Sequence, residues 1–517
     1  MQTRQPNFLL VMADQLAAPA LPCYGHNVVQ APHLTALAEN GVLFDNAYCN
    51  SPLCAPSRAS LLTGQLPSRI GAYDNAAELP ASIPTLAHHL RGCGYQTCLA
   101  GKMHFVGPDQ QHGFEERLTT DIYPADFGWT PDWDAPHERL SWYHNMLSVV
   151  QAGRCVTTNQ LDFDEEVTHQ AVRKLYDLAR QADERPFFLL ASFTHPHDPY
   201  AIPQAYWDRY RHADIAPPTV APIAYDQLDP HSRRVYEMCA MDEYAIPDEA
   251  IRTARHAYYG AISYVDDKLG QLLHALNATG LGENTIILFL SDHGDMVGER
   301  GLWYKMTFFE WSARVPLLIH APHRFAARRI SAPVSLVDLL PTLVELAGHD
   351  GAAGNADSLD GRSLAPWLHG AGDNDPPPVL GEYLAEGVEN PCLMVRRGQY
   401  KYIVSPPDTE LLYDLAVDPH ELNNLAAHPE WETLRGEFRA EVMQRWDLAA
   451  LRQAVVASQR RRRLVDRALR QGRYTPWDFQ PWQDASQQYM RNHLDLNELE
   501  RRARFPAPAA PRPKLGP

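Results

Sequence analysis

The sequence has no apolar run long enough to cross a lipid bilayer, which takes about 20 consecutive residues. The first apolar stretch, FLLVMA, is interrupted by Asp14 and has no small-residue cleavage site after it, unlike a secretory signal. We therefore expect a cytoplasmic protein without membrane attachment. The eight cysteines are scattered and lack the paired spacing of metal knuckles, which favours free thiols.

An excess of positive charge is also absent. With 46 Lys and Arg against 63 Asp and Glu, the formal net charge is −17. This balance argues against a nucleic-acid partner, because binding to a polyanion needs clustered basic side chains. A small cationic or zwitterionic molecule suits the chain better. The 517 residues have an ordinary globular composition and enough length for about two domains.

Several buried strands are predicted, and each is followed by polar side chains. The runs are NFLLVMADQ, YQTCLAGKMHF, RPFFLLASFTHPHDPY and NTIILFLSDHGD, with helical patterns over 32–41, 164–182 and 255–276 between or after them. This alternation predicts an α/β fold with a large, mostly parallel sheet between helices. Such sheets bind ligands beyond the carboxyl ends of their strands. The polar residues at that edge are Asp14, Lys102, His104, His195, His197, Asp198, Asp292, His293 and Asp295.

The character of the sequence changes near residue 376. Short strands follow, with Gly398 in a hairpin, and a helix begins at about Glu430. These features predict a smaller α+β domain with a short antiparallel sheet. We therefore divide the chain into a catalytic domain over 1–375, a subdomain over 376–480 and a tail over 481–517, which ends in a proline-rich segment.

Two carboxylates and an imidazole at the ends of two separate strands predict a site for one divalent cation. The residues are Asp14, Asp292 and His293. Hard oxygen ligands favour Ca²⁺, Mg²⁺ or Mn²⁺, and the imidazole shifts the choice towards Mn²⁺. The segment SDHGD alone is equally compatible with a turn whose aspartate caps a helix. The second strand-end carboxylate, Asp14, favours the metal site.

The segment NSPLCAPSRASLLTG places Cys54 near the start of a helix that Gly64 ends. A helix N-terminus stabilises an anion and lowers the pKa of a thiol, and Arg58 adds a positive charge one turn later. A lone cysteine is more commonly a packing residue. The Cys-x-Pro-x-Arg spacing nevertheless favours chemistry at Cys54.

The segment CAPSRASLLTG resembles the signature of the sulfatases of the alkaline phosphatase superfamily, and NFLLVMADQ, GKMHF, SDHGD and LYDLAVDPHELNNLA are similar to other parts of that family. Within it, SFTHPHDPY and GERGLWYKMTFFE are most similar to choline sulfatases. The resemblance implies an alkaline phosphatase-like fold and a formylglycine made from Cys54 by a formylglycine-generating or anaerobic maturase. It also implies one divalent metal ion, Mn²⁺ or Ca²⁺, bound by Asp14, Asp292, His293 and residue 54. Gln15 stands where a second aspartate is common in sulfatases.

The resemblance implies roles for further residues. Arg58 orients the formylglycine, Lys102 and His104 lie beside it with His104 as the base, and His197 and Lys305 bind sulfate and protonate the departing alkoxide. The choline group of the implied substrate is a quaternary ammonium, which has no N–H to donate. Aromatic faces and carboxylates must therefore recognise it. The substrate-binding residues implied are Asn75, Trp129, His144, Asn145, Glu386 and Asn497. Taken singly, Lys305 is typical of a surface lysine, and Trp129 and His144 are typical of core residues.

The resemblance therefore implies hydrolysis of choline-O-sulfate to choline and sulfate. One alternative is a phosphonate monoester or phosphodiester hydrolase that uses the same formylglycine. Another is a binding protein with an inactive sulfatase fold, which the presence of Cys54, Asp14, Asp292 and His293 disfavours. The charged tail segment YMRNHLDLNELERRARFP resembles the choline sulfatase tail that reaches a neighbouring subunit, and it predicts a homotetramer.

Overall fold

The computed structural model describes residues 4–349, 357–372, 376–474 and 477. Its largest sheet has eight strands, with β1 (Asn7–Asp14) between β9 (Thr285–Ser291) and β7 (Phe187–Pro196). All residues of these three strands are buried, which explains their continuous apolar runs. Their order in the sheet is β12 (Arg328–Ile330), β2 (Val42–Phe44), β11 (Leu317–His320), β9, β1, β7, β4 (Gln96–Gly101) and β5 (Glu116–Arg117).

The strand directions confirm the predicted fold class. Strand β1 pairs in parallel with both β7 and β9, so that Leu9 lies opposite Leu189 on one side and Ile287 on the other. Strand β4 is parallel to β7 and β5, and β12 is parallel to β2. Only β11 runs antiparallel to its two neighbours within this described sheet. The carboxyl ends of β1, β9, β7 and β4 therefore meet at one edge.

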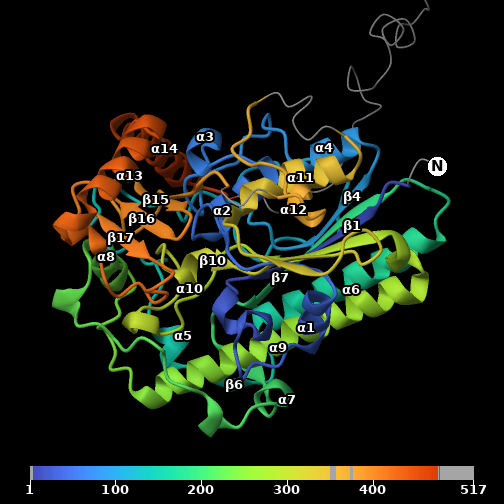
Figure 1. The fold of residues 1–517 in the computed structure, drawn as a ribbon, viewed down its shortest axis with the longest axis horizontal. Coiled ribbons are helices and arrows are strands. Elements are labelled where there is room, and N and C mark those ends of the chain that lie inside the picture. The colour runs from blue at the N-terminus through green and yellow to red at the C-terminus, as the bar shows by residue number, and fades with distance from the viewer. Residues whose placement is uncertain (1–3, 350–356, 373–375, 475–476, 478–517) are drawn as a thin grey trace, which may run out of the picture. The chain divides into compact units, whose positions relative to one another are not determined.

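Helices cover both faces of this sheet (Figure 1). One face carries α1 (Pro32–Glu39), α6 (Asn159–Arg180) and α9 (Asp248–Thr279), and the other carries α2 (Cys54–Thr63), α4 (Leu86–Gly92) and α11 (Leu339–Leu346). Helix α9 begins earlier than the predicted 255–276, since Pro247 precedes it and Asp248 and Glu249 occupy its first turn, where acidic side chains are favourable.

Shorter elements connect these layers. A three-stranded sheet consists of β10 (Arg314–Val315), β3 (Ala47–Tyr48) and β13 (Val334–Ser335), and β6 (Gly153–Cys155) pairs with β8 (Ala201–Pro203). The short helices are α3 (Pro67–Ile70), α5 (Leu147–Val150), α7 (Gln204–Trp207), α8 (Pro230–Met238), α10 (Glu310–Ala313) and α12 (Ala365–Leu368).

The predicted short antiparallel sheet near the carboxyl end is confirmed. Its strands follow one another as β14 (Val379–Tyr383), β15 (Cys392–Arg397), β16 (Tyr400–Val404) and β17 (Leu411–Asp414). Gly398 lies in the β15–β16 turn with φ +57°, a conformation that glycine adopts at little cost. The helix predicted from about Glu430 is α13 (Glu432–Arg445), and a second helix, α14 (Leu448–Leu469), follows it.

The small sheet shares its core with the large one. Val379 and Tyr383 of β14 belong to the same buried cluster as β1, while Phe438 of α13 packs with Tyr402 in a second cluster. The predicted boundary at residue 376 therefore stays a prediction, as does the tail over 481–517, which lies outside the described residues. Within the described part of the chain, no helix combines the length and the apolarity that a bilayer crossing needs. All eight cysteines are free thiols, as predicted.

Candidate active site

Four predicted metal ligands meet at the carboxyl edge of the large sheet. Asp14 is the last residue of β1, Asp292 and His293 directly follow the neighbouring strand β9, and Cys54 is the first residue of α2. One ligand atom from each of these four residues lies within 4.8 Å of the others, and all four side chains are buried. The fold thus brings together residues that are far apart in the sequence, since Asp14 and His293 are separated by 279 positions.

The donor atoms of this cluster fit a divalent cation. His293 donates its Nδ1–H to the Gly294 carbonyl over 3.0 Å, so its Nε2 lone pair faces the cluster, 3.2 Å from Cys54 Sγ and 3.7 Å from Asp14 Oδ1. A second hydrogen bond of this kind typically orients a metal-binding imidazole. Once Cys54 is converted to the formylglycine that the resemblance implies, residue 54 carries an oxygen in place of the sulfur. Two carboxylates, one such imidazole and this oxygen form a suitable ligand set for a hard cation.

Two buried cations flank the cluster. Arg58 places Nε 2.8 Å from Asp292 Oδ2 and donates from Nη1 to Ser192 Oγ over 2.8 Å and to the Lys102 carbonyl. The Lys102 ammonium contacts Asp14 and lies 3.4 Å from Cys54 Sγ. Burial alone raises the pKa of Asp14, but Lys102 and the other nearby cations hold that pKa well below its ordinary value. The Asp14 carboxylate is thereby kept ionised.

A third predicted group, His104, lies among aromatic side chains near Lys102. It is buried, and neither ring nitrogen has a hydrogen-bond partner among the residues that the structure describes. Its ring packs against Tyr123 and Trp129 with centroids 5.2 and 5.7 Å away, and its backbone N–H donates to Asp121 over 2.8 Å. Such an imidazole is available to an incoming polar group.

His197 and Lys305 form a direct pair. The Lys305 ammonium donates to His197 Nε2 over 2.8 Å and to Gln15 Oε1 over 2.6 Å, while His197 Nδ1 donates to the Asp198 carbonyl. Burial, reinforced by Lys305, lowers the pKa of His197 well below its ordinary value. The imidazole is therefore neutral, with its Nε2 lone pair directed at Lys305.

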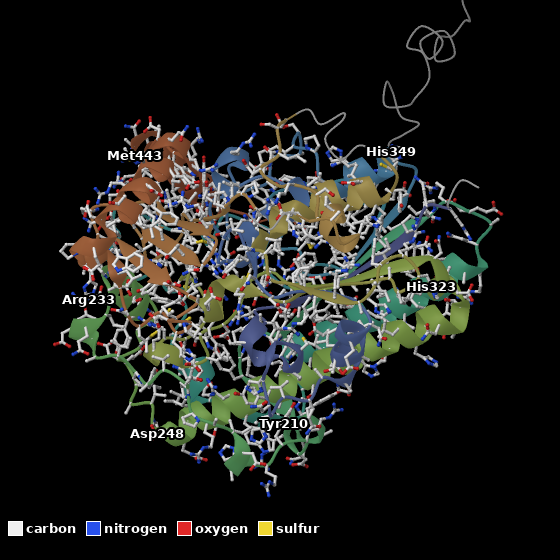
Figure 2. The ribbon with its side chains drawn as sticks, viewed as in Figure 1. Tyr210, Arg233, Asp248, His323, His349 and Met443 are labelled. Carbon is white, nitrogen blue, oxygen red and sulfur yellow. The ribbon has the colours of Figure 1, made fainter. Side chains whose placement is uncertain are left out.

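The other nearby histidine of that strand, His195, has a different partner. Its Nδ1 lies 2.7 Å from Asp164 in the core. His195 is thus engaged by Asp164, whereas His197 faces Lys305. Away from the site, the labelled His323 and His349 lie exposed at the outside of the ribbon (Figure 2).

The predicted substrate-binding residues have defined contacts. Asn75 accepts the Ala55 N–H through Oδ1 over 3.0 Å, which leaves its amide NH₂ for a ligand. Trp129 stacks on Trp142 at 6.2 Å, and the His144 ring stacks on Tyr304 at 4.5 Å and lies 6.1 Å from His197. Asn145, beside His144, accepts from the Tyr304 hydroxyl through its carbonyl. Asn497 lies outside the described residues.

Glu386 follows β14 and is buried, with a carboxylate oxygen, Oε2, that has no partner among the described residues. Burial raises its pKa to about 7; nearby Asp74 acts in the same direction and Lys305 in the opposite one. Such a carboxyl is poised to take up a cation, which would restore its ionised form.

The sequence reasoning did not single out Tyr123. Its ring lies 4.2 Å from the Lys102 ammonium and packs against both Trp129 and His197, with centroids 5.2 and 6.0 Å away. Tyr123 thus connects the residues around Cys54 with those around Trp129. Its position in the same irregular, aromatic-rich segment as Trp129 was the available signal.

Comparison with known proteins identifies the family. The family model described as "Sulfatase" matches residues 6–349, two thirds of the chain. The chain belongs to the sulfatase family. Within this sulfatase, a model described as "Choline sulfatase enzyme C terminal" matches residues 453–505, and one described as "N-sulphoglucosamine sulphohydrolase, C-terminal" matches residues 298–447.

Individual relatives agree with this family. The choline-sulfatase of Rhizobium meliloti (strain 1021) is 49% identical over 514 residues, covering 98% of this chain and 99% of the relative. The arylsulfatase of Clostridium perfringens (strain 13 / Type A) is 30% identical over 83% of this chain and 92% of its own. Among solved structures, the phosphonate monoester hydrolase of Agrobacterium radiobacter superposes with a TM-score of 0.68 at 26% identity, over 87% of this chain and 96% of the other.

The site predicts that the Asp292→Asn variant loses bound metal. Removing one of two carboxylate charges weakens the cluster, and we expect an affinity for the divalent ion roughly 100-fold lower or worse, since even outer partners of metal ligands contribute 10- to 100-fold. Elemental analysis of dialysed protein measures this directly. As a control, Asp183→Asn changes an exposed aspartate paired with Arg185 and should keep the wild-type metal content. Equal metal content in both variants would contradict the assignment.

Proposed function

We propose that this chain hydrolyses choline-O-sulfate to choline and inorganic sulfate. The observation that carries the proposal is the buried cluster of Asp14, Cys54, Asp292 and His293, beside which the Lys102 ammonium lies over the Tyr123 ring. Glu386 adds a buried carboxyl whose pKa burial raises and Lys305 lowers. The extensive identity to the choline-sulfatase of Rhizobium meliloti and the carboxy-terminal family match support the same substrate.

Residue 54 and the cluster supply the nucleophile in this proposal. Formylglycine made from Cys54 by a maturase would provide hydroxyls as its hydrate. Asp14, Asp292 and His293 would hold Mn²⁺ or Ca²⁺, which would lower the pKa of those hydroxyls and offset negative charge. Arg58 and Lys102 hold the cluster carboxylates and the start of α2 in place. His104, whose ring nitrogens are unpartnered among the described residues, would accept a proton from residue 54.

The sulfate half of the substrate meets positive and N–H donor groups. Lys102 lies 3.4 Å from Cys54 Sγ, Asn75 accepts the N–H of the next residue, Ala55, and Lys305 contacts Gln15. These three side chains would bind the sulfuryl oxygens. The Lys305–His197 pair holds one proton between Nζ and Nε2. That proton can pass to the departing alkoxide, which removes the need to release a strong base into a buried site.

The choline half is a quaternary ammonium, which makes no N–H hydrogen bonds. Trp129 and Tyr123 offer ring faces, each worth about 0.5–2 kcal/mol for a cation. Glu386 adds a carboxylate, and His144 and Asn145 complete the wall next to His197. This combination of aromatic rings and a buried carboxyl favours a cationic leaving group over a neutral one.

A hydrolase of phosphonate monoesters or phosphodiesters is the second candidate. The structural likeness to the phosphonate monoester hydrolase of Agrobacterium radiobacter favours it, because the chemistry at residue 54 would serve either ester. A homotetrameric assembly and a cytoplasmic location complete the proposal. The assembly rests on the tail and its Asn497, which lie outside the described residues.

Turnover of matched substrates separates the two candidates. We expect kcat/KM for choline-O-sulfate to exceed that for 4-nitrophenyl sulfate and for a phenyl phosphonate monoester by at least about 100-fold. This factor corresponds to the summed binding free energy of two or more contacts to the cation. The enzyme must first be matured, which the mass of the peptide containing residue 54 reports. A preference for the phosphonate ester would establish the second candidate instead.

Glu386 predicts an acid limb in the pH profile. Because its pKa is about 7 in the free enzyme and only the ionised form attracts a cation, kcat/KM for choline-O-sulfate should fall as the pH drops through about 7. Neighbouring Tyr143, Cys239 and Tyr383 remain neutral across that range, because burial raises the pKa of each.

A bound choline cation favours the carboxylate, so the same limb should lie at lower pH in the profile of kcat. The Glu386→Gln variant should lose this limb for choline-O-sulfate while its profile for 4-nitrophenyl sulfate stays that of the wild type. An unchanged choline-O-sulfate profile in the variant would exclude Glu386 as the titrating group.

A further inference from the structure

Helix α14 is linked by hydrogen bonds to both walls of the proposed choline pocket. Gln459 of α14 accepts the Trp133 backbone N–H through Oε1 over 2.9 Å. The indole N–H of Trp133 then donates to the Ala385 carbonyl over 2.8 Å. Gln459 and Trp133 are each only 2% exposed. Because Trp133 lies four residues after Trp129 and Ala385 directly precedes Glu386, this chain of bonds connects the two walls.

A second residue of α14 reinforces the same link. Arg462 contacts both carboxylate oxygens of Asp74 at 2.7 Å and donates to Thr130 Oγ1 over 3.1 Å. The pair is almost fully buried, and such a bidentate contact has a restricted geometry. Asp74 precedes Asn75, and Thr130 follows Trp129. Arg462 therefore holds the turn with Asn75 and the segment with Trp129 at a set separation.

Further contacts continue along the helix towards solvent. Arg463 pairs with Asp132, and Arg460 contacts both carboxylate oxygens of Asp134 at 2.6 and 2.8 Å. Thus every residue of 130–134 except Pro131 is bonded to α14, the orange-red helix at the upper left of Figure 1.

The segment with Trp129 has no regular structure to position it. Between β5, which ends at Arg117, and α5, which begins at Leu147, the structure contains neither helix nor strand. Segments of this kind take their position from side-chain contacts and not from a backbone ladder. A misplacement of about 1 Å in a substrate-positioning residue can cost 10²-fold in rate. The contacts to α14 therefore help to place Trp129, together with its ring packing against His104, Tyr123 and Trp142.

We propose that Gln459 and Arg462 are positioning residues that set the separation of Trp129 and Glu386, and so determine the preference for a choline leaving group. Neither side chain touches residue 54 or its ligands; each acts through the residues it holds. The inference rests on the proposed function for its substrate. It assigns to the carboxy-terminal helix a role in leaving-group recognition, while the groups at residue 54 act on the sulfate.

The test compares two substrates that share the sulfate. In the full-length, matured enzyme, Gln459→Leu removes the acceptor of the Trp133 N–H at nearly constant volume. We expect KM for choline-O-sulfate to rise roughly 10- to 100-fold, while kcat for 4-nitrophenyl sulfate stays within about 2-fold of wild type. Gln459→Glu keeps an acceptor oxygen for the Trp133 N–H, and its negative charge lies next to Arg462 and Arg463 on the same helix face. This variant should therefore have a KM for choline-O-sulfate near that of the wild type.

Two further variants make the outcome decisive. Arg461→Gln changes an exposed arginine of α14 and should behave as wild type on both substrates. Trp133→Phe removes the indole donor to Ala385 together with part of the ring. This variant is used instead of Gln459→Leu if thermal unfolding shows that Gln459→Leu does not fold. Equal losses on both substrates, or no loss on either, in a folded variant would overturn the inference.

The wild-type measurement separates this inference from the function on which it rests. A wild-type enzyme that does not prefer choline-O-sulfate contradicts the proposed function. If the wild-type enzyme prefers choline-O-sulfate and the Gln459→Leu and Trp133→Phe variants keep the same preference, only the proposed role of α14 is contradicted.

Discussion

The structure around residue 54 depends on the pairing of buried opposite charges. Asp14 and Asp292 are completely buried, and carboxylates in such a place are unfavourable unless cations and hydrogen bonds compensate them. Arg58 and Lys102 provide that compensation from α2 and from the end of β4. A divalent ion at the same carboxylates, as the sulfatase family implies, would add further positive charge there.

The parallel sheet explains how these charges meet. Strands β1 and β9 are hydrogen-bonded neighbours in parallel, so Asp14 and Asp292 leave the sheet at the same edge. Helix α2 begins there with Cys54, and Arg58 lies one turn further along. The groups around residue 54 are thus supported by regular elements, whereas the proposed choline pocket includes an irregular segment that is hydrogen-bonded to α14. In the proposed function, the sulfate half of the substrate would therefore contact residues on strands and a helix, and the choline half would contact residues of an irregular segment.

The sequence predicted the regular elements around residue 54 better than the irregular segment around Trp129. Asp14, Asp292 and His293 were identifiable because strand-end polar residues following continuous apolar runs mark one edge of a parallel sheet. Cys54 and Arg58 were identifiable from helix-start spacing. Tyr123 and Trp133 lie where no periodicity gives side-chain direction, and the contact of Gln459 with Trp133 spans 326 residues. Such pairings depend on tertiary packing that local patterns do not encode. Helix α14 was missed for a related reason, since its charged sequence carries only a narrow apolar face.

The most direct test of the account is the position of the metal in crystals of the matured enzyme loaded with Mn²⁺, measured by anomalous diffraction. The account predicts one strong peak within about 2.5 Å of oxygen or nitrogen ligands from Asp14, Asp292 and His293, with an oxygen of residue 54 in the same shell. A fully loaded, active enzyme whose peak lies elsewhere, or whose residue 54 is out of reach of the metal, would contradict it.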